Sequence, residues 1–194
     1  MSFDTATNRI NGVSYDNAGN STSVDGHTYA YDAENRAKTI DGNPANYVYD
    51  AAGVRVKNGS TLYIFSGSKV IAEYASGALA KEYVYLGDKL IATWTGAIGS
   101  QVLTYQLADL LSTRVDDATA TTTIKVGHLP FGDSWYGSSS KWKFTSYERD
   151  ANTDTDYAMF RQHQWKYGRF MQAEPDTWKR PQSTAFQPLC IHTQ

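Results

Sequence analysis

The segment YVYDAAGVRVKN at residues 47–58 contains the pattern that decides the fold. A Tyr-rich extended segment runs into an Asp, then a short turn, then a second extended segment. Two clear copies precede it, VSYDNAGN at 13–20 and YAYDAENRAKTI at 29–40, and degenerate copies follow at 62–74 and 83–94. The aspartates of the three clear copies are 16 and 18 residues apart, which predicts one strand-turn-strand hairpin per repeat.

The turns of the three clear copies share one chemistry. Each opens with Asp, whose carboxylate can accept hydrogen bonds from the backbone amides of the turn, and each closes on Gly or Asn. Gly and Asn adopt a left-handed backbone conformation at little cost, so the closing position is predicted to need one. The predicted turn residues are Asp16 with Gly19, Asp32 with Asn35, and Asp50 with Gly53.

Tyrosines stand two apart in the strands that lead into these turns. Successive side chains of a strand point to opposite faces, so both members of a pair project from the same face. Stacked hairpins would align the pairs into an aromatic ladder, in which cross-strand pairs contribute about 0.2–1 kcal/mol each. The expected ladder residues are Tyr29, Tyr31, Tyr47, Tyr49, Tyr83 and Tyr85.

The composition fits one folded unit with little attraction for polyanions. The 194 residues include 18 basic and 20 acidic side chains, which gives a formal charge of −2. This balance creates no overall field toward nucleic acid or an anionic membrane, so neither is expected as a partner. No stretch approaches the length of a transmembrane helix and no secretion signal is visible, which leaves the localisation open.

Recognisable catalytic and metal-binding patterns are missing from the sequence. The four histidines occupy unrelated segments and Cys190 is the only cysteine, so we expect neither a metal site nor a cofactor. Ser139 and Ser140 lie in a Ser-rich stretch without the Gly-x-Ser-x-Gly pattern of a nucleophile. Basic and aromatic side chains alternate over 141–169, but four acidic residues interrupt them and favour solvated strand faces. The chain is therefore not expected to be an enzyme.

Three further blocks, together with the Tyr-Asp repeats, resemble the Rhs/YD-repeat family of polymorphic-toxin shell proteins and its C-terminal core region. Residues 105–114 are similar to Y-x-x-x-D-H-L-G-S-x-R, without its His and its Gly. Residues 128–133 resemble x-x-P-F-G-E, and 144–170 resemble F-T-G-K-E-R-D-x-x-T-G-L-D-Y with a later G-R-F. The resemblance places core-motif residues at Asp109, Arg114, Pro130, Phe131, Gly132, Glu148, Arg149, Asp150, Asp156, Tyr157, Arg161, Gly168, Arg169 and Phe170.

The resemblance implies a container. In that family an antiparallel strip winds into a hollow β-shell, and the core region closes it around a C-terminal toxin. Many members also cleave themselves at an Asp-Pro motif after the G-R-F segment. Here Glu174 precedes Pro175, and no Gly follows at the motif's position, so self-cleavage is not expected. An aspartyl mechanism, were it present, would draw on Asp150, Glu174 and Asp176.

These observations together predict an all-β chain of consecutive antiparallel hairpins that form a curved open sheet, a fragment of an Rhs/YD-type β-shell. We assign residues 1–94 to hairpin repeats, 95–176 to the core region and 177–194 to an irregular tail without a toxin domain. The expected function is encapsulation, in a truncated piece of a longer parent, with upstream YD repeats and an encapsulated toxin as partners. The alternative is a carbohydrate-binding or cell-surface module that uses exposed Tyr and Trp faces.

Overall fold

The described part of the chain is built almost entirely from β-strands. Its only other regular elements are two short 3₁₀ turns, η1 (Pro130–Gly132) and η2 (Phe144–Ser146), so the predicted all-β class is confirmed. Neither of these turns is long and apolar enough to cross a membrane. The computed structural model describes residues 2–44, 46–108, 113–118, 124–137 and 141–173.

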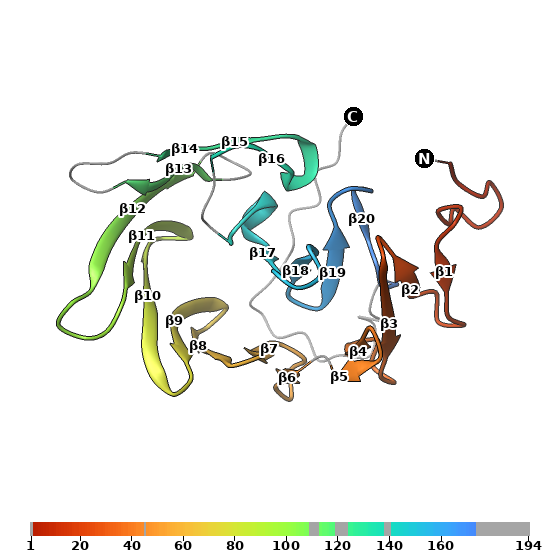
Figure 1. The fold of residues 1–194 in the computed structure, drawn as a ribbon, viewed down its shortest axis with the longest axis horizontal. Coiled ribbons are helices and arrows are strands. Elements are labelled where there is room, and N and C mark those ends of the chain that lie inside the picture. Colours follow the sequence, from red (N-terminus) through yellow and green to blue (C-terminus); the bar gives the residue numbers. More distant parts are fainter. Residues whose placement is uncertain (1, 45, 109–112, 119–123, 138–140, 174–194) are drawn as a thin grey trace.

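Fourteen strands follow one another as antiparallel hairpins and form a long curved strip (Figure 1). Strands β1–β5 hydrogen-bond in chain order in one sheet, and β6–β14 do so in a second, nine-stranded sheet. The predicted series of hairpins in an open arrangement is thereby confirmed. The strands are β1 (Ser14–Tyr15), β2 (Ser21–Val24), β3 (His27–Tyr31), β4 (Ala37–Ile40), β5 (Asn43–Pro44), β6 (Tyr47–Tyr49), β7 (Arg55–Asn58), β8 (Thr61–Ser66), β9 (Lys69–Ala75), β10 (Ala78–Leu86), β11 (Lys89–Thr95), β12 (Val102–Ala108), β13 (Thr113–Ala118) and β14 (Ile124–Lys125).

The hydrogen-bonded ladder of the described residues is interrupted between β5 and β6. Pro44 ends β5 and has no amide hydrogen to donate to a following strand. Asn46 has a φ of 54°, so the chain turns sharply just before β6 begins. The strip therefore consists of two sheets, where the sequence pattern predicted one.

The C-terminal part of the described chain folds back into the concave side of the strip. It begins with a two-stranded sheet, and a four-stranded antiparallel sheet follows. Figure 1 shows the four-stranded sheet inside the arc that the strip traces. We call residues 141–173 the core segment. The additional strands are β15 (Gly127–His128), β16 (Ser134–Tyr136), β17 (Glu148–Arg149), β18 (Asp156–Ala158), β19 (Arg161–Gln164) and β20 (Arg169–Phe170).

The face of the strip that carries the repeat tyrosines turns toward the core segment. Tyr29, Tyr63 and Tyr83 are each no more than 6% exposed. Apolar side chains of the strip and the core segment meet in two clusters, and burial of such surface is the main stabilising term of a small domain. One cluster contains Val24, Tyr29 and Met171, and the other contains Tyr63, Val70 and Tyr83 with Trp142 packed against them.

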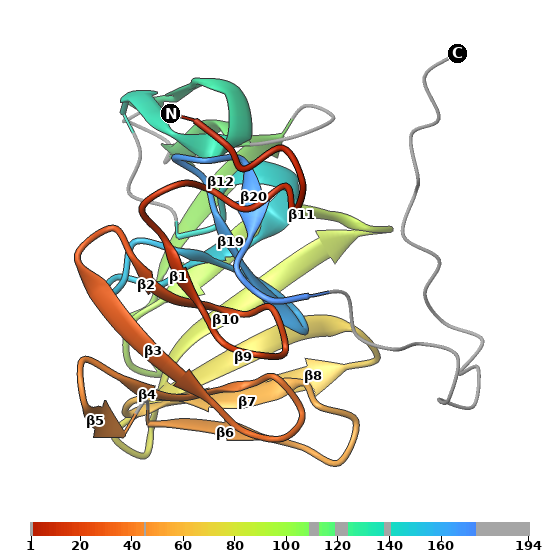
Figure 2. The ribbon, with the colours of Figure 1, turned by 90° about the vertical axis from the view of Figure 1, so that its right-hand side faces the viewer.

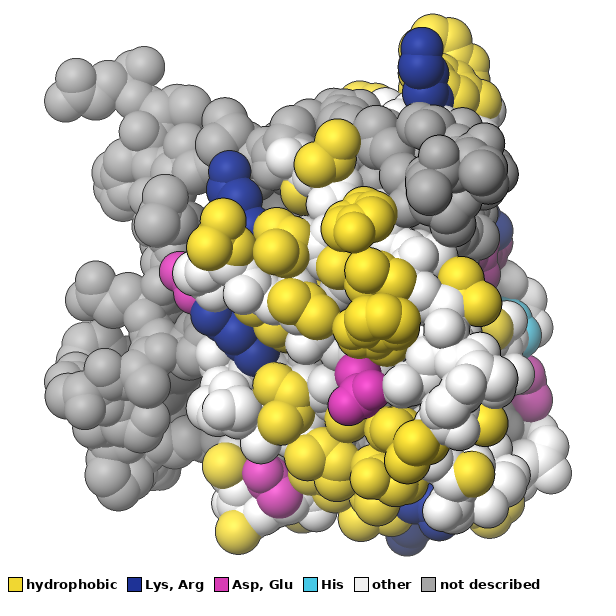
Figure 3. All heavy atoms as spheres, turned by 90° about the vertical axis from the view of Figure 1, so that its left-hand side faces the viewer, with side chains coloured by type: hydrophobic (Ala, Val, Ile, Leu, Met, Phe, Trp, Pro, Cys, Tyr) yellow, Lys and Arg dark blue, Asp and Glu magenta, His cyan; other side chains and the backbone are white. Residues whose placement is uncertain are grey.

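The opposite face of the nine-stranded sheet presents apolar side chains to solvent. Strand register places Ile64, Ala72, Glu82 and Trp94 in one row across β8–β11, and cross-strand partners share a face. Figure 3 shows apolar side chains gathered over this side of the molecule. Six members of this outer face are between 36% and 51% exposed: Leu62, Ile64, Tyr74, Val84, Trp94 and Tyr105.

Candidate functional site

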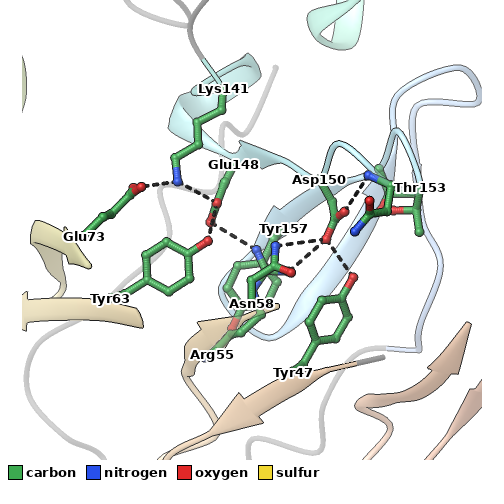
Figure 4. A network of polar contacts seen from close by, with 12 residues as sticks. Tyr47, Arg55, Asn58, Tyr63, Glu73, Lys141, Glu148, Asp150, Thr153 and Tyr157 are labelled. Carbon is green, nitrogen blue, oxygen red and sulfur yellow. Dashed lines mark hydrogen bonds and ion pairs between the residues drawn. The ribbon is translucent and has the colours of Figure 1, made fainter. Parts of the chain in front are cut away.

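One buried arginine joins the strip to the core segment. Arg55 lies on β7, two residues after the turn that ends at Gly53, and its side chain is 1% exposed. Its Nη2 donates to Glu148 Oε2 at 3.1 Å, and its Nη1 donates to Asp150 Oδ2 at 3.4 Å. Figure 4 shows both carboxylates reaching down from the core segment. Arg55 thus pairs with residues that lie 93 and 95 positions further along the chain.

Neutral donors complete the hydrogen bonding of the two carboxylates. Tyr63 Oη donates to Glu148 Oε1 at 2.6 Å, and Tyr47 Oη donates to Asp150 Oδ2 at 2.7 Å (Figure 4). Asn58 Nδ2 also donates to Asp150 Oδ2, at 3.3 Å. With the ion pairs of Lys141, these residues form one network, which we call the Arg55 clasp: Tyr47, Arg55, Asn58, Tyr63, Glu73, Lys141, Glu148 and Asp150.

Aromatic rings hold the Arg55 guanidinium from two sides. Its Cζ lies 4.0 Å from the ring centroid of Tyr157 and 4.9 Å from that of Tyr47. Tyr157 also accepts a hydrogen bond from the Arg55 backbone amide through its Oη, at 2.8 Å. Cation–π contacts gain strength where water is excluded, so the rings favour the charged form at this buried position.

The charges of the clasp shift the acid-base behaviour of Glu148. Burial alone would raise the pKa of the Glu148 carboxyl, but Lys141 and Arg55 outweigh burial and hold that pKa below its ordinary value. Lys141 Nζ lies 2.8 Å from Glu148 Oε1 and 2.5 Å from Glu73 Oε1, so it bridges the core segment and β9. Tyr83 donates a further hydrogen bond to Glu73. Two cations therefore face three carboxyl groups in the clasp.

The clasp is suited to fixing two layers relative to each other. A buried ion pair contributes little net stability compared with apolar packing, but loss of one partner leaves an uncompensated buried charge. Each carboxylate of the clasp contacts at least one donor from the other layer. These contacts fix the position of the strip and the core segment relative to each other. Within the described ranges, no group of three or more His, Cys, Asp or Glu side chains is placed to hold a metal ion.

A second ion pair lies within the core segment. Arg149 Nε contacts Asp156 Oδ1 at 2.5 Å, and its Nη2 donates to the Gly132 carbonyl at 3.1 Å. Its guanidinium also lies 5.0 Å from the Trp165 ring centroid. Three core-motif positions, Gly132, Arg149 and Asp156, are thus brought together, and they tie η1 to the four-stranded sheet.

Aromatic contacts position two more of the core-motif residues. Phe131, which follows Pro130 in η1, packs against Phe144 with ring centroids 6.0 Å apart. A Cβ at Gly168 would lie 3.0 Å from the Phe131 ring, so a side chain there would force the ring to shift, and the φ of 61° also favours glycine.

The remaining core-motif residues do not gather at one place. Arg161 lies over the Phe170 ring at 3.7 Å. Arg169 reaches the N-terminal loop, where its Nη1 donates to the Asn8 carbonyl at 2.8 Å. Arg114 lies on β13, and Asp109, Glu174 and Asp176 lie outside the described residues.

The three repeat turns close in the same way. The closing residues Gly19, Asn35 and Gly53 have φ values of 87°, 60° and 82°. In each turn the closing amide donates to the carbonyl of the opening Asp, at 3.0–3.1 Å. The Oδ1 atoms of Asp16, Asp32 and Asp50 accept the amides of Asn20, Arg36 and Val54 at 2.8–2.9 Å.

Four of the six repeat tyrosines donate hydrogen bonds through their hydroxyls: Tyr31, Tyr47, Tyr83 and Tyr85. The rings of Tyr29 and Tyr31 stack with centroids 6.4 Å apart, and those of Tyr47 and Tyr49 meet edge to face at the same distance. Tyr85 Oη donates to the Val70 carbonyl at 3.0 Å. Burial raises the pKa of Tyr49 and of Tyr85 to about 12, so both stay protonated at neutral pH.

Only part of the clasp was predicted from the sequence. Glu148 and Asp150 were predicted as core-motif residues and Tyr47 as a ladder residue, but Arg55 was not singled out. A signal for Arg55 was present, because the hairpin register pairs it with Tyr49 and so places it on the tyrosine face. The other missed members are Asn58, Tyr63 and Glu73, with Lys141 noted only in an alternating basic and aromatic stretch.

Comparison with known proteins links the chain to bacterial nucleases. It is 26% identical over 183 residues, 84% of its length, to the tRNA3(Ser)-specific nuclease WapA of Bacillus spizizenii. The tRNA nuclease WapA of Bacillus subtilis strain 168 and the tRNA(Glu)-specific nuclease WapA of Bacillus subtilis subsp. natto are also 26% identical. The chain spans 8% of the length of these relatives. No family model matches it.

These relatives correct one prediction and support another. The prediction that the chain is not an enzyme is wrong, because all three relatives are named tRNA nucleases. That prediction rested on local motifs within a chain that spans 8% of the length of these relatives. The broader expectation of a relationship to bacterial toxin-type proteins is supported.

Proposed function

We propose that the chain is part of a larger tRNA nuclease, in which the strip forms a stretch of the wall of an Rhs-type encapsulating shell. The Arg55 clasp is the observation that carries the shell part of this proposal, and the similarity to the WapA nucleases supports the nuclease part. It fastens the core segment to the concave face of the strip through charges that are almost fully buried, Arg55 at 1% and Asp150 at 1% exposure. A layer held inside a curved wall in this way is suited to closing a container.

The edges of the strip support a place in a longer wall. Within the described residues, β1 pairs only with β2 and β14 pairs only with β13. Each leaves a row of backbone groups that can pair with another strand. Upstream YD repeats would extend the strip at β1, and the nuclease portion of the protein would be the enclosed cargo.

The test uses the protein from its source cells, captured with an antibody raised to residues 142–176. We expect a species several-fold larger than 21.5 kDa whose enclosed part resists protease until the shell is opened by denaturant. That part should cleave tRNA once it is released and refolded. A discrete 21.5 kDa species without larger forms would overturn the wall proposal. A large species that never cleaves tRNA would overturn the nuclease part.

Carbohydrate binding is a second candidate, favoured by the outer face and not by the ladder tyrosines. Tyr74 and Leu62 border an open hollow of about 550 Å³ together with Lys57, Ser60 and Ser76. Trp94 and Tyr105 continue the aromatic surface on β11 and β12. Flat aromatic side chains beside hydroxyl and amine groups suit the faces and hydroxyls of sugar rings.

A binding measurement tests this second candidate. We expect cellohexaose or chitohexaose to bind the full chain saturably, and Tyr74→Ala and Trp94→Ala to weaken binding. Trp135→Ala is the matched control, because Trp135 is 71% exposed but lies on β16, away from the outer face. Equal losses in all three variants, or no saturable binding, would exclude the outer face as a sugar site.

A further inference from the structure

A second hollow lies where the two ends of the described chain meet. It has a volume of about 350 Å³ and is lined by residues 7–24 on one side and 164–173 on the other. Figure 2 shows the N-terminal segment running beside β20. Small-ligand pockets typically measure about 300–1,000 Å³, so this hollow, which we call the terminal pocket, is large enough for a small organic molecule.

The charges on the wall of the terminal pocket are all positive. Its fifteen lining residues include Arg9 and Arg169 but no Asp or Glu. Asp4 is a nearby carboxylate, and its Oδ1 accepts hydrogen bonds from the Thr7 backbone amide and hydroxyl. Two guanidinium groups without a lining carboxylate favour an anionic ligand.

The two arginines are positioned differently. Arg169 is fixed by the Asn8 carbonyl at 2.8 Å and by Asn8 Oδ1 at 3.0 Å, which leaves further N–H groups of its guanidinium available. Arg9 lies over the Tyr15 ring at 4.8 Å. Within the described ranges, no ion pair or side-chain hydrogen bond engages its guanidinium, so its planar fork can bind an oxyanion.

A buried amide adds a neutral donor. Gln164 lines the pocket and is 1% exposed, and its Nε2 has no hydrogen-bond partner among the described residues. Its Oε1 accepts the Lys166 amide at 3.3 Å, which orients the side chain. A buried donor without a partner is unfavourable, and a ligand oxygen would satisfy it.

We propose that the terminal pocket binds a small organic oxyanion, a phosphate ester or a carboxylate. Arg9 and Arg169 would pair with the oxyanion, and the Gln164 amide would donate to one of its oxygens. Tyr15 and Tyr167 also line the pocket and offer flat surfaces to the organic part. The inference rests on these residues alone and is independent of the proposed nuclease shell.

Titration calorimetry on the full chain tests the pocket with 5′-AMP, inorganic phosphate, citrate and uncharged adenosine. We expect saturable binding of 5′-AMP or citrate that weakens as salt is added, and none of adenosine. A preference for 5′-AMP identifies a phosphate ester, and a preference for citrate identifies a carboxylate. Both support the oxyanion site.

Substitutions then assign the binding to the pocket. Arg9→Met removes a cation from an exposed loop and should weaken the preferred anion at least about tenfold, the usual effect of a lost charge-assisted hydrogen bond. Arg36→Met is the matched control, since Arg36 is paired with Asp32 and Glu34 away from the pocket. No binding by any anion, or equal affinity in Arg9→Met and wild type, would overturn the proposal.

Discussion

At the scale of single residues, the environment of Arg55 decides what this side chain does. A lysine or arginine on an exposed strand face is a solvated charge, and its ion pairs contribute about 0–1 kcal/mol. Arg55 has the opposite surroundings, because it is 1% exposed and faces Glu148 and Asp150 across two layers. Removal of such a charge has consequences on both sides of the interface.

Replacement of Arg55 by methionine should therefore be strongly destabilising. Arg55→Met keeps most of the side-chain volume but leaves Asp150 without its counter-charge and Glu148 paired with Lys141 alone, which costs about 3–5 kcal/mol of unfolding free energy. Urea denaturation followed by circular dichroism measures the loss. Arg36→Met, at a half-exposed pair with Asp32, should cost no more than about 1 kcal/mol. Equal losses in the two variants would show that Arg55 behaves as a surface charge.

Glu148 should make stability depend on acid pH. Because its folded pKa lies below its ordinary value of 4.5, its contribution is complete above pH 4.5 and is lost as the pH falls through the lower folded pKa. Glu148→Gln should be less stable than wild type at neutral pH, and the two stability curves should converge toward acid pH. Urea midpoints across this range provide the measurement. Glu34→Gln, 61% exposed in its side chain, should parallel wild type throughout.

At the scale of elements, the repeat turns determine where each hairpin forms, and the consecutive hairpins pair side by side to build the strip. The order of strands in both sheets follows from these local signals, so the fold class was predictable from the sequence. The clasp was only partly predictable, because Arg55 and Glu148 are 93 residues apart and no local pattern connects them. The break after β5 also escaped prediction, because another Tyr-Asp repeat follows Pro44, with its Asp 18 residues after the previous one compared with 16 for the preceding pair.

Gly19 provides a test of the turn chemistry at one hairpin. Its φ is 87°, and a Cβ there would meet no atom within 4 Å, so backbone strain is the only cost of a side chain. Gly19→Ala should lose about 1–2 kcal/mol of unfolding free energy, and Gly19→Asn should lose less. Asn17→Ala in the same turn is the control, expected within about 0.5 kcal/mol of wild type. An alanine variant as stable as wild type would mean that the turn tolerates another conformation.

At the scale of the whole molecule, the strip and the core segment behave as one unit only as long as their contacts hold. Two apolar clusters join them, one at Met171 and one at Trp142, and the Arg55 clasp lies on the same interface. The strip also has its own continuous ladder from β6 to β14. The core segment has four short strands of two to four residues each, so it depends more on the interface than the strip does.

This asymmetry predicts how the molecule should open when the clasp is broken. In wild type, amides of β8 and β19 should exchange with solvent through the same global opening, because the layers share buried charges. In Arg55→Met, protection of the β19 amides should fall by roughly a hundredfold or more, the equivalent of about 3 kcal/mol. The β8 amides should keep more of their protection, because β8 remains hydrogen-bonded within the nine-stranded sheet. Hydrogen exchange read by mass spectrometry on both strands measures this, with Arg36→Met as the control. A parallel fall in β8 and β19 would mean that the layers open together even without the clasp, and that the apolar clusters alone hold the core segment against the strip.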